Sequence, residues 1–120
     1  MSKLILDLKD STPIRDERYG TIYELAGSVT GLEELGFAWV EVDVGAASPE
    51  HFHKKMSELY QIVEGTGIMT LDRQSFPVSS GQCVSIPPGV IHAIRNTGSM
   101  PLRFFCATSP AYNEEDDFEI

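Results

Sequence analysis

The chain has 120 residues, 42% of them apolar and 22% charged, which is typical of a single globular domain. Its formal net charge of −9 argues against nucleic acid and anionic membranes as partners, because phosphate groups are bound by clustered lysine and arginine. No segment approaches the length of a membrane span, and the start MSKLILDLKD is not that of a signal peptide. We therefore expect a cytoplasmic protein.

The first third of the chain predicts an arm followed by two strands. Residues 1–18 mix charges and contain a proline, so we expect a leading arm, and residues 19–25 alternate weakly, as in a strand. Residues 37–44 alternate strictly, and one face carries an alanine and three valines. The other face carries Phe37, Trp39, Glu41 and Asp43. Because the valine face is more apolar, we expect it to face the core and the aromatic face to lie outside, at a dimer contact. In the alternative orientation, Glu41 would point inward as a substrate contact or general base.

The segment from Glu50 to Val63 could be read as a helix, but its two histidines argue for strands. On a helix, His51 and His53 would point about 200° apart, whereas residues two apart on a strand point the same way. A turn over residues 54–57 and a second strand starting at Glu58 then bring that carboxylate to the same side.

The remainder of the chain predicts short strands separated by glycine and proline. We expect them at 68–72, 76–78, 83–86, 90–96 and 102–108, with a hairpin turn at 73–75. Such regular spacing indicates an all-β barrel or sandwich. Cys83 and Cys106 lie in apolar runs, and we expect both to be buried free thiols. Residues 111–120 are strongly acidic and are expected to form a solvated tail.

The only three histidines of the chain lie in these strands, together with one glutamate. Three imidazoles and one carboxylate suit a divalent first-row metal. Their positions fall within two blocks that resemble the two signature motifs of the cupin superfamily. The first block is Gly45-AASPE-His51-Phe-His53-KKMS-Glu58-LYQIVE-Gly65, and the second is Gly81-QCVSI-Pro87-Pro-Gly89-VI-His92-AIR-Asn96. Every motif position is filled, and 15 residues separate the blocks.

The resemblance implies a cupin-type double-stranded β-helix, or jelly-roll barrel, as a single domain over residues 19–110. It also implies one divalent metal ion per chain inside the barrel, with ligands His51, His53, Glu58 and His92. Small cupins often form homodimers through an N-terminal strand. Four protein ligands would leave an octahedral ion two positions for water or substrate, so Fe(II), Mn(II) or Ni(II) is preferred, although zinc could occupy the site.

Other side chains are candidates for contact with a substrate. Tyr60 shares the face of Glu58 and could donate or accept a proton near the metal, although packing or substrate contact is the stronger interpretation. Phe104 on the last strand is expected to wall the pocket, and Cys106 on the same face is expected to be inert. Asn96 is expected to bond to the backbone at a strand end.

The fold alone does not fix the function, because cupins include dioxygenases, isomerases, decarboxylases, lyases and non-catalytic binders. We expect a metal-dependent enzyme that acts on a small polar metabolite, of dioxygenase, isomerase or lyase type. A sugar-phosphate isomerase is weakened by the scarcity of basic residues near the motifs. The alternative is a non-catalytic module that binds a small molecule or a sugar.

Overall fold

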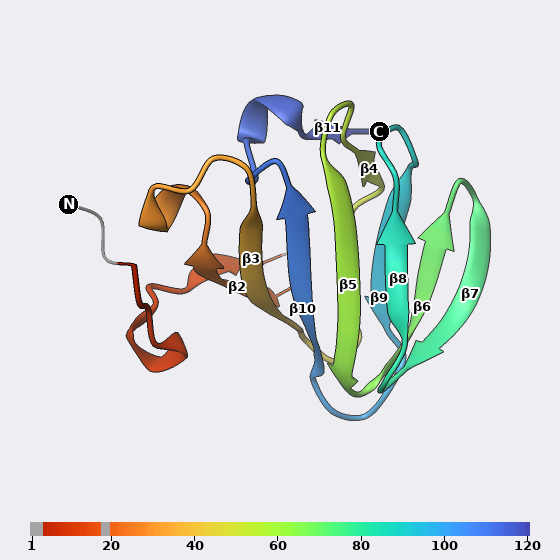
Figure 1. Cartoon of the computed structure of the whole chain (residues 1–120). Coiled ribbons are helices and arrows are strands. Elements are labelled where there is room, and N and C mark those ends of the chain that lie inside the picture. The colour runs from red at the N-terminus through yellow and green to blue at the C-terminus, as the bar shows by residue number, and fades with distance from the viewer. Residues whose placement is uncertain (1–3, 18–19) are drawn as a thin grey trace.

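The protein, described here by a computed structural model covering residues 4–17 and 20–120, folds into two antiparallel sheets (Figure 1). The six-stranded sheet has the order β1 (Ile14–Asp16), β2 (Gly20–Ala26), β3 (Gly36–Val42), β10 (Leu102–Ser109), β5 (Ser57–Glu64) and β8 (Cys83–Ile86). The five-stranded sheet has the order β11 (Phe118–Glu119), β4 (His51–Phe52), β9 (His92–Asn96), β6 (Thr66–Leu71) and β7 (Gln74–Ser79). The only helical turns among the described residues are η1 (Leu8–Asp10), η2 (Ser28–Thr30) and η3 (Glu114–Asp116). The predicted all-β fold is therefore confirmed, and no described helix has the length and apolar character to span a membrane.

The core lies between the sheets and is built by alternate residues of each strand. Val42 on β3 and Met69 on β6 have no exposed surface, and Ile62 on β5 and Ile94 on β9 are at most 2% exposed. These residues belong to one continuous apolar cluster. Each strand therefore turns one row of side chains inward, as the period of two requires.

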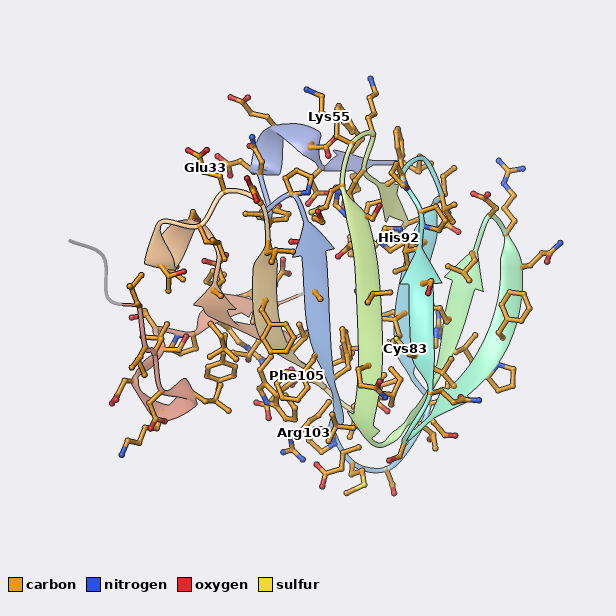
Figure 2. All side chains as sticks on the ribbon, in the orientation of Figure 1. Glu33, Lys55, Cys83, His92, Arg103 and Phe105 are labelled. Atoms are coloured by element: carbon orange, nitrogen blue, oxygen red, sulfur yellow. The ribbon has the colours of Figure 1, made fainter. Side chains whose placement is uncertain are left out.

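The valine face of β3 points into this core, and the aromatic face points outward, as expected. Phe37 and Trp39 contact Phe105 of β10, with ring centroids 5.0 and 4.8 Å apart. On the same surface, Glu41 accepts a hydrogen bond from Arg103 Nε at 2.6 Å. Figure 2 shows Phe105 and Arg103 projecting from β10. This register separates Glu41 from the interior.

Two turns differ from the predicted boundaries. Strand β3 ends at Val42, because a turn closed by the Ala46 N–H and the Asp43 carbonyl (3.0 Å) follows it; Val44 is therefore 54% exposed and does not join the core. Strands β6 and β7 are joined by the two residues Asp72 and Arg73, both with positive φ (46° and 70°), and not by residues 73–75. Positive φ at both positions is typical of the tight hairpin turns that match strand twist.

Asn96 fastens the end of β9, as expected from its position. Its amide nitrogen donates to the carbonyls of Val42 (3.0 Å) and Met100 (2.9 Å), and its amide oxygen accepts from the Gly98 N–H (2.9 Å). The side chain is only 2% exposed. One buried amide thus satisfies three backbone groups where the two sheets meet.

The expectation of two buried thiols is wrong for one of them. Cys83 starts β8 on its outward face and is exposed (labelled in Figure 2), whereas Cys106 is partly buried against the core. A run of apolar residues does not reveal which of them face the core when only one face of the strand is packed against the other sheet.

Both ends of the chain join the sheets. Strand β1 lies in the expected N-terminal arm and pairs with β2, while residues 1–3 of that arm and residues 18–19, where the first strand was expected to begin, lie outside the described residues. The acidic C-terminal segment is not a free tail: β11 pairs with β4, and the segment crosses one end of the molecule (Figure 1). Most of its acidic side chains nevertheless remain exposed.

Candidate metal centre

Four side chains from three strands and one loop converge at the end of the core. His51 on β4 is paired with His92 on β9, His53 directly follows β4, and Glu58 is the first inward residue of β5. One possible ligand atom from each residue lies within 4.8 Å of the others. His53, Glu58 and His92 are 3%, 7% and 1% exposed, so the cluster is shielded from solvent on most sides. Figure 2 shows His92 at the same end of the molecule as the C-terminal segment.

The backbone fixes which nitrogen of each imidazole faces the centre. His51 Nδ1 lies 2.8 Å from the Pro49 carbonyl, and His92 Nδ1 lies 2.9 Å from the Val90 carbonyl. His53 Nδ1 lies 2.6 Å from the carbonyl of Asp116. A carbonyl oxygen only accepts, so each Nδ1 carries a proton, and the neutral rings present their Nε2 lone pairs to the cluster. The three rings are thus set in the form that binds a metal.

Glu58 places negative charge at the point where these lone pairs meet. Its Oε1 atom lies 2.9 Å from His53 Nε2 and 3.1 Å from His92 Nε2. Its Oε2 atom accepts a hydrogen bond from the Cys106 thiol at 3.2 Å. Glu58 Oε1 and His92 Nε2 are both buried and lack a conventional hydrogen-bond partner among the described residues. Lone pairs and a carboxylate at these distances need a shared proton or cation between them, so the group could hold a divalent metal ion.

The acid–base properties of the metal-free cluster follow from burial and mutual contact. Burial opposes ionisation of Glu58, but its contacts with His53 and His92 outweigh it and hold its pKa well below the usual range. Burial lowers the pKa of His53, but the contact with Glu58 outweighs it and raises that pKa overall. Burial, and then the nearby His92, lower the pKa of His51. Burial and the Glu58 charge raise the pKa of the Cys106 thiol, which therefore stays protonated and donates to Glu58, in agreement with an inert thiol.

The acid stability of the metal-free protein should reveal these lowered carboxyl pKa values. The pKa of Asp116 is also lowered: its partial burial opposes ionisation, but N–H donors from Lys54, Met56 and Lys55 outweigh it. Because Glu58 and Asp116 have lower pKa values in the folded chain, the unfolded chain binds more protons, and their stabilisation is lost as the pH falls through the folded values. We expect the unfolding temperature to fall between about pH 5 and about pH 2, and to fall less steeply in Asp116→Asn. Parallel curves for the two proteins, measured by circular dichroism, would contradict this role of Asp116.

The C-terminal segment supports the loop that carries His53. Besides its carbonyl bond to His53, Asp116 accepts hydrogen bonds through its carboxylate from the N–H groups of Lys54 (2.8 Å), Lys55 (3.1 Å) and Met56 (3.0 Å). The Ile120 N–H donates to the Glu50 carbonyl at 3.0 Å, on the other side of β4. This C-terminal clasp, residues 113–120, was not foreseen from the sequence, because a run of acidic residues has the composition of a solvated tail.

A cavity of about 650 Å³ opens beside the cluster, against His51, His53 and Glu58. Tyr60 and Phe104 form part of its wall, with ring centroids 4.5 Å apart, and Tyr60 meets the His92 ring edge-on at 6.3 Å. Both residues therefore lie where substrate contact was predicted, and contact itself remains a prediction.

Glu41 is not part of this site. It contacts Arg103 and borders a groove on the outer face of the six-stranded sheet, lined also by Tyr23 and Trp39. The interpretation of Glu41 as a substrate contact or base at the metal centre is therefore wrong. The valine face of β3 packs into the core, and this turns Glu41 to the outer face of the sheet. Among the cavity residues that were not predicted are Glu24 on β2 and Thr108 on β10. Their strands were predicted, and the alternation of residues 102–108 already placed Thr108 on the face of Phe104 and Cys106.

The chain is similar to known proteins over almost its whole length. A family model described as "Cupin domain" matches residues 38–108, which include all four residues of the cluster. An uncharacterized protein from Methanocaldococcus jannaschii is 37% identical over 108 residues, covering 90% of this chain and 81% of that protein. The alginate biosynthesis protein AlgA of Pseudomonas putida is 32% identical over 122 aligned positions, covering 99% of this chain. The chain spans only 25% of the length of AlgA.

A solved structure shows the same fold. The sugar phosphate isomerase from a cupin superfamily of Silicibacter pomeroyi matches with a TM-score of 0.75 at 24% identity, covering 88% of this chain and 75% of that chain. At this identity the likeness concerns the fold alone. The family match, the relative of similar length and the His₃Glu cluster lead to one conclusion: the chain belongs to the cupin superfamily.

Proposed function

We propose that this cupin is a metal-dependent enzyme that acts on a small polar metabolite bound in the cavity beside the metal centre. The observation that carries the proposal is the convergence of three fixed Nε2 lone pairs and the Glu58 carboxylate at the wall of that cavity. His51, His53, Glu58 and His92 would hold one divalent ion, and we favour Fe(II), Mn(II) or Ni(II) over zinc. When bound, the ion would act as a Lewis acid or activate O₂.

The chain's own residues would orient and protect the substrate. The Tyr60–Phe104 pair forms an apolar wall next to the cluster, and the core behind it excludes water from one side of the cavity. Tyr60 is 7% exposed, and its ring approaches His92, so its hydroxyl is a candidate to hold or transfer a proton during the reaction. Reaction types that need such proton movement include isomerisation and elimination.

The proposal is tested by loading the metal-free protein with Fe(II), Mn(II), Ni(II) or Zn(II), each followed by elemental analysis. The loaded forms are then screened for oxygen uptake, and for conversion of small polyols, amino sugars and hydroxy acids. Stoichiometric metal with turnover in any of these assays supports the proposal. Stoichiometric metal with tight ligand binding and no turnover would favour a binding module, and failure to bind metal would refute the metal centre.

For a reaction identified in this way, Tyr60→Phe should separate catalysis from binding. Loss of a proton-transferring hydroxyl is expected to lower kcat about 100-fold or more, while the metal content stays at the wild-type level. Phe104→Leu, which alters the partner ring without removing a hydroxyl, is the matched control and should change mainly KM. An unchanged kcat in Tyr60→Phe would leave Tyr60 a packing residue only.

We also propose a cytoplasmic homodimer. The support is the outward aromatic group Phe37, Trp39 and Phe105, which leaves Phe37 39% exposed on the outer face of the central strands β3 and β10. Apolar rings on a sheet surface are common at subunit contacts. Sedimentation of the wild type against Phe105→Glu measures the association directly.

A further inference from the structure

The cavity beside the metal centre has a strong excess of acidic groups. None of the described residues that line it is lysine or arginine, and six are acidic: Asp16, Glu24, Glu58, Glu114, Asp117 and Glu119. Asp16 and Glu119 have other contacts, and the Asp117 carboxylate accepts a hydrogen bond from the Tyr112 hydroxyl at 2.8 Å. Basic side chains near the motifs have other contacts: Arg103 is bound to Glu41 on the outer face, and Lys54 lies 4.5 Å from the centre of the Phe118 ring.

Glu24 lines the cavity from strand β2 of the six-stranded sheet. It shares a face of the strand with Ile22, which packs against the core. Tyr23 lies between them on the opposite face and borders the outer groove. In the strand register, Glu24 of β2 lies opposite Ala38 of β3, and Ala38 lies opposite Cys106 of β10. Only the methyl side chain of Ala38 therefore lies between Glu24 and β10, the strand next to Glu58. The carboxylate is partly buried and has no hydrogen-bond or ion-pair partner among the described residues. A ligand in the cavity could supply one.

Thr108 provides a second, independent sign of a polar ligand. It is directly opposite Glu58 in the ladder and 7% exposed, and its hydroxyl has no hydrogen-bond partner among the described residues. The residue lines the same cavity. A buried hydroxyl without a partner costs free energy in the ligand-free protein, which a bound hydroxyl or amine would recover.

We infer that the cavity selects a small molecule that carries hydroxyl groups or a protonated amine and has no phosphate or carboxylate, with Glu24 and Thr108 as its contacts. This inference rests on the proposed metal-dependent function and names the substrate class for the same site. Anionic substrates need arginine, lysine or backbone donors aimed at the charge, and they are repelled by a carboxylate such as that of Glu24, which has no counter-ion among the described residues. The site therefore differs in specificity from one built for a sugar phosphate, although the fold is shared.

The test measures which small molecules approach the metal, using protein loaded with Mn(II). Paramagnetic relaxation of methyl protons is recorded for three probes of similar size and different charge: tetramethylammonium, tert-butanol and pivalate. We expect relaxation in the order tetramethylammonium, tert-butanol, pivalate, and we expect Glu24→Gln to lower the ratio of the first to the last by about twofold or more. Glu34→Gln removes the same charge at an exposed site and should leave the ratio unchanged.

The outcomes separate this inference from the function on which it rests. If the wild type fails to bind Mn(II), the metal centre is refuted and the inference falls with it. If Mn(II) binds and pivalate is relaxed as strongly as tetramethylammonium, or Glu24→Gln behaves as Glu34→Gln, the metal centre stands and the inference about charge is overturned.

Thr108→Val tests the second contact without a ligand. Because the hydroxyl has no partner, its replacement by a methyl group should leave the unfolding temperature unchanged or raise it. A lower unfolding temperature would show that the hydroxyl serves the fold, and would remove Thr108 from the ligand site.

Discussion

Glu58→Gln is expected to yield a folded chain that has lost nearly all of its metal. Glutamine keeps the size of the side chain, but it removes the negative charge that lies within 3.1 Å of both His53 and His92. Loss of an outer-shell partner typically costs about 10–100-fold in metal affinity, so loss of a direct ligand should cost more. Metal content by elemental analysis and affinity by competition with a chelating dye measure the effect.

The matched control is Glu50→Gln, which makes the same chemical change at an exposed residue next to the cluster. It should bind metal as the wild type does. Because the pKa of Glu58 is lowered in the folded chain, its charge stabilises the metal-free form, and we expect the metal-free Glu58→Gln variant to unfold at a lower temperature than the metal-free wild type. Retention of one metal ion per chain by the Glu58→Gln variant would contradict the assignment of this residue as a ligand.

The second large effect is expected at Asp116, which does not itself face the metal centre. Asp116→Ala removes a carboxylate that accepts from three successive N–H groups, and it loosens the backbone carbonyl that orients His53. We expect metal affinity to fall by about 10–100-fold, as for other outer-shell partners. The metal-free chain should lose about 1–3 kcal/mol of unfolding free energy, since bonds to a charged acceptor are broken.

A purely structural role for Asp116 would lower stability and leave the ring of His53 unchanged. The tautomer of His53, read from ¹⁵N chemical shifts, therefore decides between the two roles: the wild type should show a protonated Nδ1, and Asp116→Ala a mixture. Glu115→Ala, which alters an exposed neighbour in the same 3₁₀ turn, is the control and should leave both the spectrum and the affinity unchanged.

The ligand set could be predicted because it depends only on the strict period of a strand. His51 and His53 share a side whenever residues 51–53 are extended, and the spacing to Glu58 leaves room for one turn. The orientation of β3 was harder, since the face with Ala38 and Val40 is only slightly more apolar than the face with Phe37 and Trp39. In the structure, the register between β3 and β10 pairs Trp39 with Phe105, and the aromatic face of β3 lies on the outside.

The features that escaped prediction are those made by the backbone or by tertiary contacts. The group that Asp116 offers to His53 is a carbonyl, which every residue has, so no side-chain pattern marks it. Glu24 lies in a strand whose alternation is weak, and its inward direction is fixed only by pairing with β3. Patterns in sequence therefore located the four residues of the His₃Glu cluster, while the shape and charge of the cavity required the fold.

The bond between His53 and Asp116 joins residues that are 63 positions apart. During synthesis, the strands that carry all four ligands leave the ribosome before the residue that sets one of the rings. Any ion bound before then would meet an imidazole free to rotate. We therefore expect tight metal binding to begin late in the biogenesis of this protein, and we expect proteolytic removal of residues 113–120 to leave a folded chain poor in metal.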